Sequence, residues 1–329
     1  MYLVGDIGGT KTNISVVDSR NGKFHTIFEK SFISKEFDSL QTILKNVFNE
    51  TKIKDLKIES ACFGVAGPVK NGRCEATNLP WIIDIRKVSE TTNLSSDLIY
   101  LLNDLEAGAY GIECLEEKDF YTLNKGNPQK NGAKCLISAG TGLGEAIVVW
   151  DGNAYRPIPS EGGHTDFAPK SKMEIDLLIW LMNKYGRVSY ERILCGPGLL
   201  NVYNFFRETT YQDTPKWISE RLKKEDPSAV ISELGMEKKD EACEKALDLF
   251  VSVYGGEAGN LALKCLATNG VYIGGGIAPK ILEKIKHGSF MQSFTNKGRL
   301  SVMVAQIPVK AILNPKLPLL GCVNFLDLV

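Results

Sequence analysis

The segment YLVGDIGGTKTNISVVD, residues 2–18, consists of two apolar strand patterns, YLVGDI and NISVVD, joined by a polar turn that contains glycine. The turn region holds the carboxylate of Asp6, the pair Gly8 and Gly9, and hydroxyl and amine side chains. A tight turn between two strands requires far fewer special residues, and glycine also allows the backbone to approach a ligand closely. The segment therefore predicts a strand–turn–strand unit whose turn has a second role.

A second segment, LISAGTGLGEAIVVWD at residues 136–151, repeats the pattern of residues 3–18 without a gap. In each copy an apolar strand enters a glycine-containing turn and returns as a strand that ends at an aspartate. The identical pairs are 3/136, 9/142, 14/147, 16/149 and 18/151. Because the turns match as well as the strands, the repeat predicts two related α/β units that face each other.

The two repeated turns are suited to binding an anion. The backbone N–H groups of residues 8–9 and 140–142 can approach one anionic ligand from two sides, and the hydroxyls of Thr10 and Thr141 add donors. The GxxxxGK[ST] motif is absent and the glycines lead into strands, so the pattern is not a Walker loop. Either turn alone equally fits an ordinary glycine hairpin. The pairing, with GGGI at residues 274–277 as a third glycine turn, favours a phosphate site.

The rest of the sequence alternates strand and helix patterns at first and then becomes mostly helical from about residue 171 to 267. Asn71-Gly72 predicts a hairpin turn. The polar stretch 208–240 is interpreted as a helical excursion with loop breaks at Pro215 and Pro227. Pro279 is expected near the first position of the helix that follows the third glycine turn. Strands that alternate with helices predict a largely covered α/β sheet.

Composition excludes several classes of protein. The 329 residues are enough for two domains, and the formal net charge of zero favours neither nucleic acid nor an acidic membrane as a partner. The longest apolar stretches, such as residues 177–182, are too short to span a bilayer, and we expect no signal peptide. The eight cysteines are scattered without a CxxC pair, which predicts reduced thiols and a cytoplasmic protein.

Eight segments, taken together and in order, resemble the bacterial ATP-dependent glucokinases of the actin/hexokinase superfamily. They are GDIGGTKTN, LLNDLEAGAYG, SAGTGLGEA, EGGHTDFAP, YERILCGPGLLNVY, GGEAGNLAL, GVYIGGGIAP and NPKLPLLG. The resemblance runs from end to end of the chain. The cysteine-rich zinc motif of the related repressor and sugar-kinase family is missing, which favours the zinc-free glucokinase branch.

This resemblance implies an α/β, two-domain actin/hexokinase-like (ribonuclease H-like) fold with a cleft between the domains. Residues 1–113 plus 314–329 would form a small α/β domain, and residues 114–313 a large α/β domain with helical insertions. It also implies that ATP, with Mg²⁺, phosphorylates D-glucose to glucose 6-phosphate, the entry step of glycolysis. The resemblance further implies a homodimer.

Asn103 and Asp104 follow the apolar strand LIYLL, at the carboxyl end where ligands bind in open α/β sheets. Phosphoryl transfer to an alcohol needs a group that accepts its proton, and a positioned carboxylate suffices. From position alone, either residue could instead cap the following helix. The resemblance assigns the base to Asp104 and a sugar contact to Asn103.

The loop SEGGHTDFAP contains Glu161 and His164, which can accept and donate hydrogen bonds to sugar hydroxyls. A purely structural histidine is the alternative, and the absence of HExxH makes a metal site weak. Glu191 by itself is an acid in the first turn of a helix that follows Ser189. The resemblance makes all three sugar ligands, with Glu191 at the anomeric end, and adds Asn78 in TNLPW as a weaker candidate.

The expected nucleotide and metal contacts come from the glycine turns. Asp6, at the end of the first strand, would hold Mg²⁺ through water, and its counterpart in the repeat is the uncharged Ala139. Lys11 is a further phosphate contact, although the family tolerates other residues there. The complete set is Asp6, Ile7, Gly8, Gly9, Thr10, Lys11, Gly140, Thr141, Gly142, Gly275 and Gly276.

Three other functions remain open at this point. The first is a kinase for another hexose or an amino sugar. The second is a superfamily phosphatase or filament-type ATPase, which lacks the EGGH and YER segments. The third is a non-catalytic sugar sensor, which would have lost the base that Asp104 provides. No helix-turn-helix pattern precedes residue 1, so we do not expect a fused transcription regulator.

Overall fold

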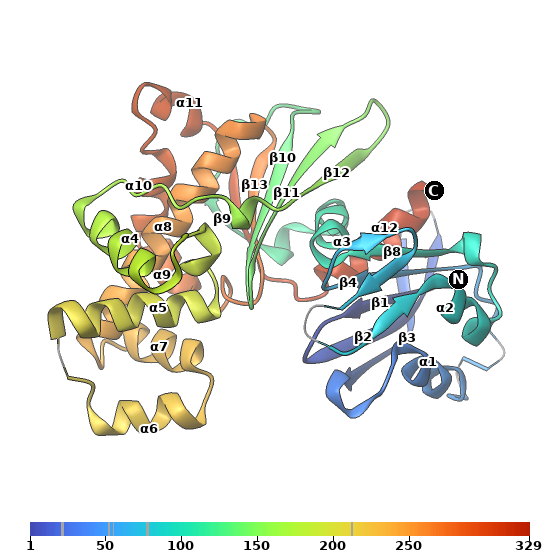
Figure 1. Ribbon diagram of the computed structural model, residues 1–329. Coiled ribbons are helices and arrows are strands. Elements are labelled where there is room, and N and C mark those ends of the chain that lie inside the picture. The colour runs from blue at the N-terminus through green and yellow to red at the C-terminus, as the bar shows by residue number, and fades with distance from the viewer. Residues whose placement is uncertain (21–22, 52, 55, 77–78, 212) are drawn as a thin grey trace. The chain divides into compact units, whose positions relative to one another are not determined.

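The computed structural model describes the chain except residues 21–22, 52, 55, 77–78 and 212, and except the side chains of residues 20 and 23. The contacts gather the chain into two compact units (Figure 1). Unit 1 consists of Met1–Glu117, Asp151–Ile158 and Asn314–Val329. Unit 2 consists of Lys118–Trp150 and Pro159–Leu313.

Among the described residues, unit 1 contains a five-stranded sheet in the order β3-β2-β1-β4-β8. The strands are β1 Tyr2–Ile7, β2 Lys11–Arg20, β3 Lys23–Ile33, β4 Ser60–Val65 and β8 Ile99–Asn103. β1, β2 and β3 pair antiparallel, whereas β1, β4 and β8 pair parallel. A small antiparallel sheet holds β5 Val69–Lys70, β6 Arg73–Glu75 and β7 Ile82–Asp84. Its Asn71-Gly72 turn has positive φ at both residues, so the predicted hairpin is confirmed.

Helices cover both faces of the five-stranded sheet, because successive side chains of a strand point to opposite faces. Leu3 of β1 packs in one core with α1 Leu40–Phe48 and α2 Ile85–Thr92. Its neighbour Val4 packs in the other core with α3 Asp104–Gly111 and α12 Leu317–Leu328. A Cβ at Gly321 would lie 1.6 Å from the carbonyl oxygen of Ala107, so α3 and α12 pack backbone against backbone.

Unit 2 repeats this strand pattern. Its described strands are neighbours in the order β11-β10-β13-β14-β9 in a sheet that also contains β12. They are β9 Phe120–Asn124, β10 Lys134–Ala139, β11 Leu143–Trp150, β13 Gly270–Gly274 and β14 Val309–Ile312, whereas β12, Tyr155–Ser160, begins in the segment assigned to unit 1. β10 pairs antiparallel with β11 and parallel with β13, and β13 pairs parallel with β14. Since β1 has the same partners in unit 1, the prediction of two related α/β units is confirmed.

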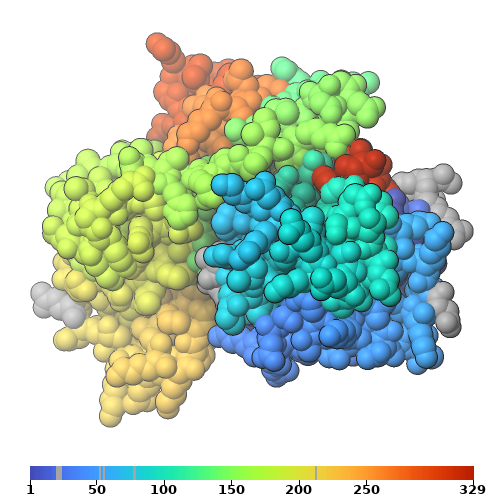
Figure 2. Space-filling model, turned by 45° about the vertical axis from the view of Figure 1, so that its right-hand side comes forward, coloured from blue at the N-terminus to red at the C-terminus, as the bar shows by residue number. Residues whose placement is uncertain are grey.

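The long helix α8, Glu241–Cys265, packs on β10 and β13 and forms the centre of the core of unit 2. Helices α5, α7 and α10 pack against it. The remaining bounds are α4 Lys172–Tyr185, α5 Gly196–Phe206, α6 Lys216–Lys224, α7 Pro227–Met236, α9 Leu282–Lys286, α10 Ser289–Thr295 and α11 Ser301–Val304. The α6–α7 segment, yellow in Figure 2, lies at one end of unit 2. No helix of the described chain is both long enough and apolar enough to cross a membrane.

Two predicted boundaries in unit 2 are wrong, at Pro279 and at Glu191, whereas the predicted loop breaks at Pro215 and Pro227 are confirmed. One break precedes α6 at Pro215, and another separates Lys224, the last residue of α6, from Pro227, the first residue of α7. This position suits proline, because the first turn of a helix does not need its N–H. Pro279 lies in a turn before α9, which begins only at Leu282. Glu191 belongs to one 3₁₀ turn, Tyr190–Arg192, while α5 begins at Gly196.

Candidate functional site

Two carboxylates of unit 1 lie at the same edge of its sheet. Asp6 is the next-to-last residue of β1, and Asp104 follows β8 directly and begins α3. Because β1, β4 and β8 are parallel, their carboxyl ends meet at one edge, which is where α/β sheets bind ligands.

The charge of Asp104 acts on the carboxyl group of Asp6. Burial, followed by the negative charge of Asp104, raises the pKa of Asp6 to about 6, against a hydrogen bond from Asn13. Burial also raises the pKa of Asp104, against backbone hydrogen bonds from Leu105 and from its own N–H. The N–H of Leu105 donates to Asp104 Oδ1 at 2.9 Å and so fixes the carboxyl group. The edge therefore concentrates negative charge that a cation or a proton can offset.

The carboxylates of Asp6 and Asp104 fit a Mg²⁺ ion whose other ligands are water and substrate phosphates. Within the described part of the chain, no group of three or more His, Cys, Asp and Glu side chains could hold a metal ion. Mg²⁺ is commonly bound by one or two carboxylates, with water and substrate phosphates completing its shell. Asp6 and Asp104 can supply these one or two carboxylate ligands but not a complete protein ligand shell.

Asn103 caps α3. Its Oδ1 accepts from the N–H of Leu105 at 3.0 Å, and its Nδ2 donates to the carbonyl of Gly67 at 3.2 Å. Its backbone N–H hydrogen-bonds Glu106, which completes a capping box. The helix-cap alternative is therefore realised for Asn103, and its side chain is engaged at both polar ends.

A serine supports the first glycine turn. The N–H of Gly8 donates to the carbonyl of Lys11 at 3.0 Å, and Ser34 Oγ donates to the carbonyl of Gly8 at 2.7 Å. Thr10 and Lys11 are exposed, whereas the side chain of Ile7 is buried in the core, so only its backbone can meet a ligand. Sequence reasoning missed Ser34, because no local pattern links it to a turn 26 residues away.

The structure brings Glu161, His164 and Glu191 together in unit 2. His164 Nε2 lies 3.9 Å from Glu161 Oε2, and His164 Nδ1 lies 3.8 Å from Glu191 Oε1. Arg187 Nη2 donates to the carbonyl of His164 at 2.7 Å, and the N–H of Tyr190 donates to the carbonyl of Thr165 at 3.1 Å. We call residues 161–165 the histidine loop. Asn78 lies outside the described residues.

The second glycine turn contacts Glu191 directly. The N–H of Leu143 donates to Glu191 Oε2 at 2.9 Å. A Cβ at Gly142 would lie 2.6 Å from the same oxygen, whereas a Cβ at Gly140 would meet nothing within 4 Å. Gly142 therefore lies against Glu191, and Gly140 faces open space.

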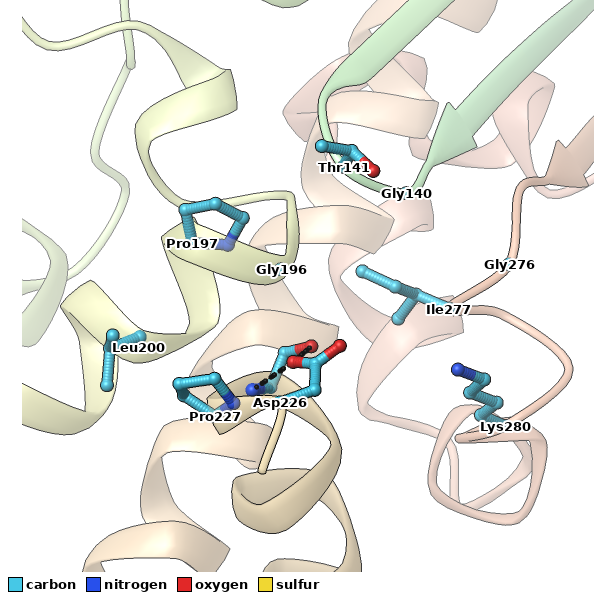
Figure 3. Close-up of a pocket in the computed structure, with 11 residues that line it drawn as sticks. Gly140, Thr141, Gly196, Pro197, Leu200, Asp226, Pro227, Gly276, Ile277 and Lys280 are labelled. Atoms are coloured by element: carbon cyan, nitrogen blue, oxygen red, sulfur yellow. Dashed lines mark hydrogen bonds between the residues drawn. The ribbon is translucent and has the colours of Figure 1, made fainter. Parts of the chain in front are cut away.

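A cavity of about 570 Å³ lies in unit 2, beside this turn (Figure 3). Of the predicted residues, Gly140, Thr141 and Gly276 line it. Sequence reasoning missed the other lining residues, which are Gly196, Pro197, Leu200, Asp226, Pro227, Ser228, Ile277 and Lys280. Gly275 has φ of 84° and its Cβ would lie 2.2 Å from the carbonyl oxygen of Ala139, so the backbone requires glycine there.

The cavity suits an anionic ligand. The first residues of α5 line it together with Lys280, and the N-terminus of a helix carries partial positive charge. The start of α7 also lines it, but the carboxylate of Asp226 already caps the N–H groups of Ser228 and Ala229. Figure 3 shows Thr141 on one side of the cavity and Ile277 and Lys280 on another. The prolines at the first turns of α5 and α7 were a sequence signal that could have located both helix starts.

Nearly the whole chain matches one protein family. The family model described as Glucokinase matches residues 3–328. The chain belongs to the glucokinase family.

Relatives and solved structures of the glucokinase family agree with this assignment. The glucokinase of Nostoc punctiforme is 40% identical over 335 residues, covering 98% of this chain and 97% of that protein. The crystal structure of a glucokinase from an Antarctic psychrotroph has a TM-score of 0.86 at 29% identity, covering 100% of this chain and 99% of that one. A ROK family glucokinase from Streptomyces griseus, solved with glucose and AMPPNP, shares the fold with a TM-score of 0.65 at 20% identity, covering 99% and 100%.

Membership in the glucokinase family confirms three predictions. The resemblance seen in the sequence is correct, the fold is of the actin/hexokinase-like α/β class, and the protein is an enzyme. The reaction of the family is the ATP-dependent phosphorylation of glucose.

The charge at the edge of the sheet has a consequence for stability. Asp6→Asn should raise the free energy of unfolding by about 1–3 kcal/mol at pH 7.5 without Mg²⁺, because a neutral amide avoids both burial of a charge and repulsion by Asp104. Since the pKa of Asp6 is raised, wild type loses this stability as the pH rises from about 4 to about 6. The gain should therefore vanish below about pH 4. Urea unfolding across pH measures it, with the exposed Asp38→Asn as control. Equal stability of wild type and Asp6→Asn at pH 7.5 would contradict this account.

Proposed function

We propose that Asp104 is the base in this protein when the γ-phosphoryl group of ATP is transferred to the 6-hydroxyl of D-glucose. The observation that carries the proposal is the partly buried carboxyl of Asp104, which stands next to a second carboxylate at the ligand-binding edge of unit 1. A carboxylate with a raised pKa is a better acceptor for an alcohol proton than an exposed one. The N–H of Leu105 keeps the group oriented during the proton transfer.

Asp6 would hold Mg²⁺ through water, with Asp104 nearby. The mutual repulsion of the two carboxylates supports this role, because a cation relieves it. Bound Mg²⁺ supplies positive charge that offsets the charge of the phosphates. The protein side chains contribute its position at the carboxyl ends of β1 and β8.

The histidine loop and Glu191 would bind the sugar. Two carboxylates accept hydrogen bonds from hydroxyls, and the imidazole between them can donate or accept. Such a polar site rejects analogues that lack a partner, because unpaired buried groups are costly. Asn78 and Asn103 remain proposed as further sugar contacts, Asn103 only if its capping hydrogen bonds are shared.

The nucleotide would occupy the cavity of unit 2. The start of α5, together with Lys280, favours its negative charge, whereas the carboxylate of Asp226 at the start of α7 opposes it. The turns around Gly8–Lys11 and Gly140–Gly142 would supply backbone N–H groups to the phosphates. We also propose that residues 1–113 plus 314–329 and residues 114–313 are the two domains that bind the substrates; the division into two compact units supports this.

Replacement of the proposed base tests the reaction. Asp104→Asn should lower kcat by about 10²–10⁴-fold, because an amide cannot accept the proton. Its glucose affinity should stay within about twofold of wild type, since the amide still forms hydrogen bonds. A coupled ADP-release assay and calorimetry measure the two quantities.

Glu106→Gln is the matched control for this variant, because it changes the next carboxyl group of α3 and preserves the capping box. It should retain wild-type turnover. Near wild-type turnover in Asp104→Asn would remove Asp104 from the mechanism. Wild type must also favour glucose in a sugar panel. Faster phosphorylation of fructose or N-acetylmannosamine would instead support the alternative of a kinase for another hexose or an amino sugar.

The two ends of the second glycine turn should separate nucleotide from sugar binding. Gly140→Val should raise KM for ATP by about tenfold or more and leave glucose unchanged, because its side chain enters the nucleotide cavity. Gly142→Ala should raise KM for glucose by about tenfold to a hundredfold, because its Cβ collides with Glu191 Oε2. Initial rates at varied ATP and glucose measure both. If both variants changed only the KM for ATP, the link between Gly142 and Glu191 would have no role in binding.

We further propose a cytoplasmic homodimer. All eight cysteines are free, in keeping with a reducing compartment. Helix α4 carries Ile175, Ile179 and Met182 exposed at helical spacing, and a self-complementary apolar stripe suits a two-fold interface. Light scattering should therefore give a dimer for wild type and a monomer for Ile179→Glu. A monomeric wild-type protein would rule the homodimer out.

A further inference from the structure

A buried carboxyl group lies directly beneath the histidine loop. Glu145 of β11 is 1% exposed, and its Oε1 is buried without a hydrogen-bond partner among the described residues. Its Oε2 faces the loop so closely that a Cβ at Gly162 would lie 2.1 Å from it. A Cβ at the neighbouring Gly163 would lie 2.0 Å from the carbonyl oxygen of Leu143. The loop therefore rests on β11, with the carboxyl of Glu145 as part of its support.

A second buried acid stands behind Glu145. Glu257 of α8 is fully buried. Lys264 Nζ donates to its Oε1 at 2.9 Å, and Asn260 Nδ2 donates to its Oε2 at 2.8 Å. Asn260 Nδ2 also donates to the hydroxyl of Tyr190 at 3.0 Å, and Tyr190 precedes Glu191 in the chain. The cluster thus supports the proposed sugar ligands at two points, at Gly162 and beside Glu191.

The charge of this cluster favours a neutral Glu145. Burial, followed by the charge of Glu257, raises the pKa of Glu145 to about 7, against the charge of Lys264. Lys264 is already paired with Glu257, so an ionised Glu145 would be buried beside a like charge. The other titratable groups near the two acids are Cys135 of β10, Tyr254 and Cys265 of α8, Tyr190, Lys170 and Lys297.

We propose that Glu145, in its neutral form, is a positioning residue that holds the histidine loop in the glucose-binding arrangement. When it ionises, the carboxylate requires hydration, because no described residue hydrogen-bonds its Oε1 and Lys264 is already paired with Glu257. Gly162 lies against its Oε2, so hydration of the group displaces the loop and weakens glucose binding. The inference rests on the proposed sugar site and adds a residue that does not contact the sugar.

The first experiment measures glucose affinity against pH without nucleotide. Wild type should lose about tenfold in affinity between pH 6 and pH 8. Glu145→Gln, which keeps the shape and is always neutral, should bind as wild type does at pH 6 and stay constant to pH 8. The pH profile of kcat should be the same in both. An equal loss of affinity in wild type and Glu145→Gln, or no loss in wild type, would overturn the proposal.

A double-mutant cycle tests the contact itself. Gly162→Ala should weaken glucose binding, because the new methyl group collides with Glu145 Oε2. Glu145→Ala removes that collision, so the double variant should bind glucose better than the product of the two single effects predicts. Additive effects would mean that Glu145 does not support Gly162. Urea unfolding and circular dichroism verify that each variant is folded. If Glu145→Ala does not fold, the pH experiment with Glu145→Gln still tests the proposal.

Two further variants separate this inference from the proposed sugar site. Glu174→Gln changes a buried carboxyl of α4, 3% exposed, that accepts from the N–H of Lys170, and it should leave the pH dependence of wild type unchanged. Glu191→Ala should weaken glucose binding at every pH. If Glu191→Ala binds normally, the sugar site is wrong. If Glu191→Ala binds glucose weakly and Glu145→Gln loses glucose affinity with rising pH as wild type does, only the role of Glu145 is wrong.

Discussion

The placement of Asp6 and Asp104 at one edge of the sheet is the constraint on which the rest of unit 1 depends. Both carboxyls are partly buried, burial raises the pKa of each, and the charge of Asp104 raises that of Asp6 further. Such a pair persists only if the surrounding structure is rigid enough to hold it. Parallel pairing of β1 with β4 and of β4 with β8 holds the two strand ends at one edge. Separate cores on the two faces of the sheet, and the backbone contact between α3 and α12, then keep those strands in place.

In unit 2 the corresponding strand pair, β10 and β11, places its turn between a cavity and the carboxylate of Glu191. The turn between β10 and β11 has one glycine open toward the cavity and another against the carboxylate of Glu191. One short turn therefore contacts both the proposed nucleotide cavity and the proposed sugar ligands. The histidine loop rests on the next residues of β11, where Glu145 is buried beneath Gly162. A substitution in this turn or strand is consequently expected to affect the binding of both ATP and glucose, because few atoms separate the two regions.

The predictions succeeded where the signal is local or repeated. The strand–turn–strand repeat gave the correct pairing of β1 with β2 and of β10 with β11, because alternation and turn glycines are set by neighbouring residues. The Asn71-Gly72 hairpin succeeded for the same reason. The breaks at Pro215 and Pro227 also succeeded, since proline cannot continue a preceding helix and suits the start of the next one. Leu200, Asp226 and Lys280 were missed because they belong to three separate segments of the chain that meet only in the folded unit.

The sequence by itself determined the α/β class, the two related units, the family and the grouping of Glu161 with His164, because each depends on periodicity, turn chemistry or short spacing. Only the tertiary structure decided which glycine of the second turn faces the cavity and which faces Glu191. It also decided that Ser34 supports the first turn, and that the carboxyl of Glu145 is buried next to Glu257. Burial and the nearest charges set the behaviour of an ionisable group, and both arise from residues that are distant in the chain and become neighbours only on folding.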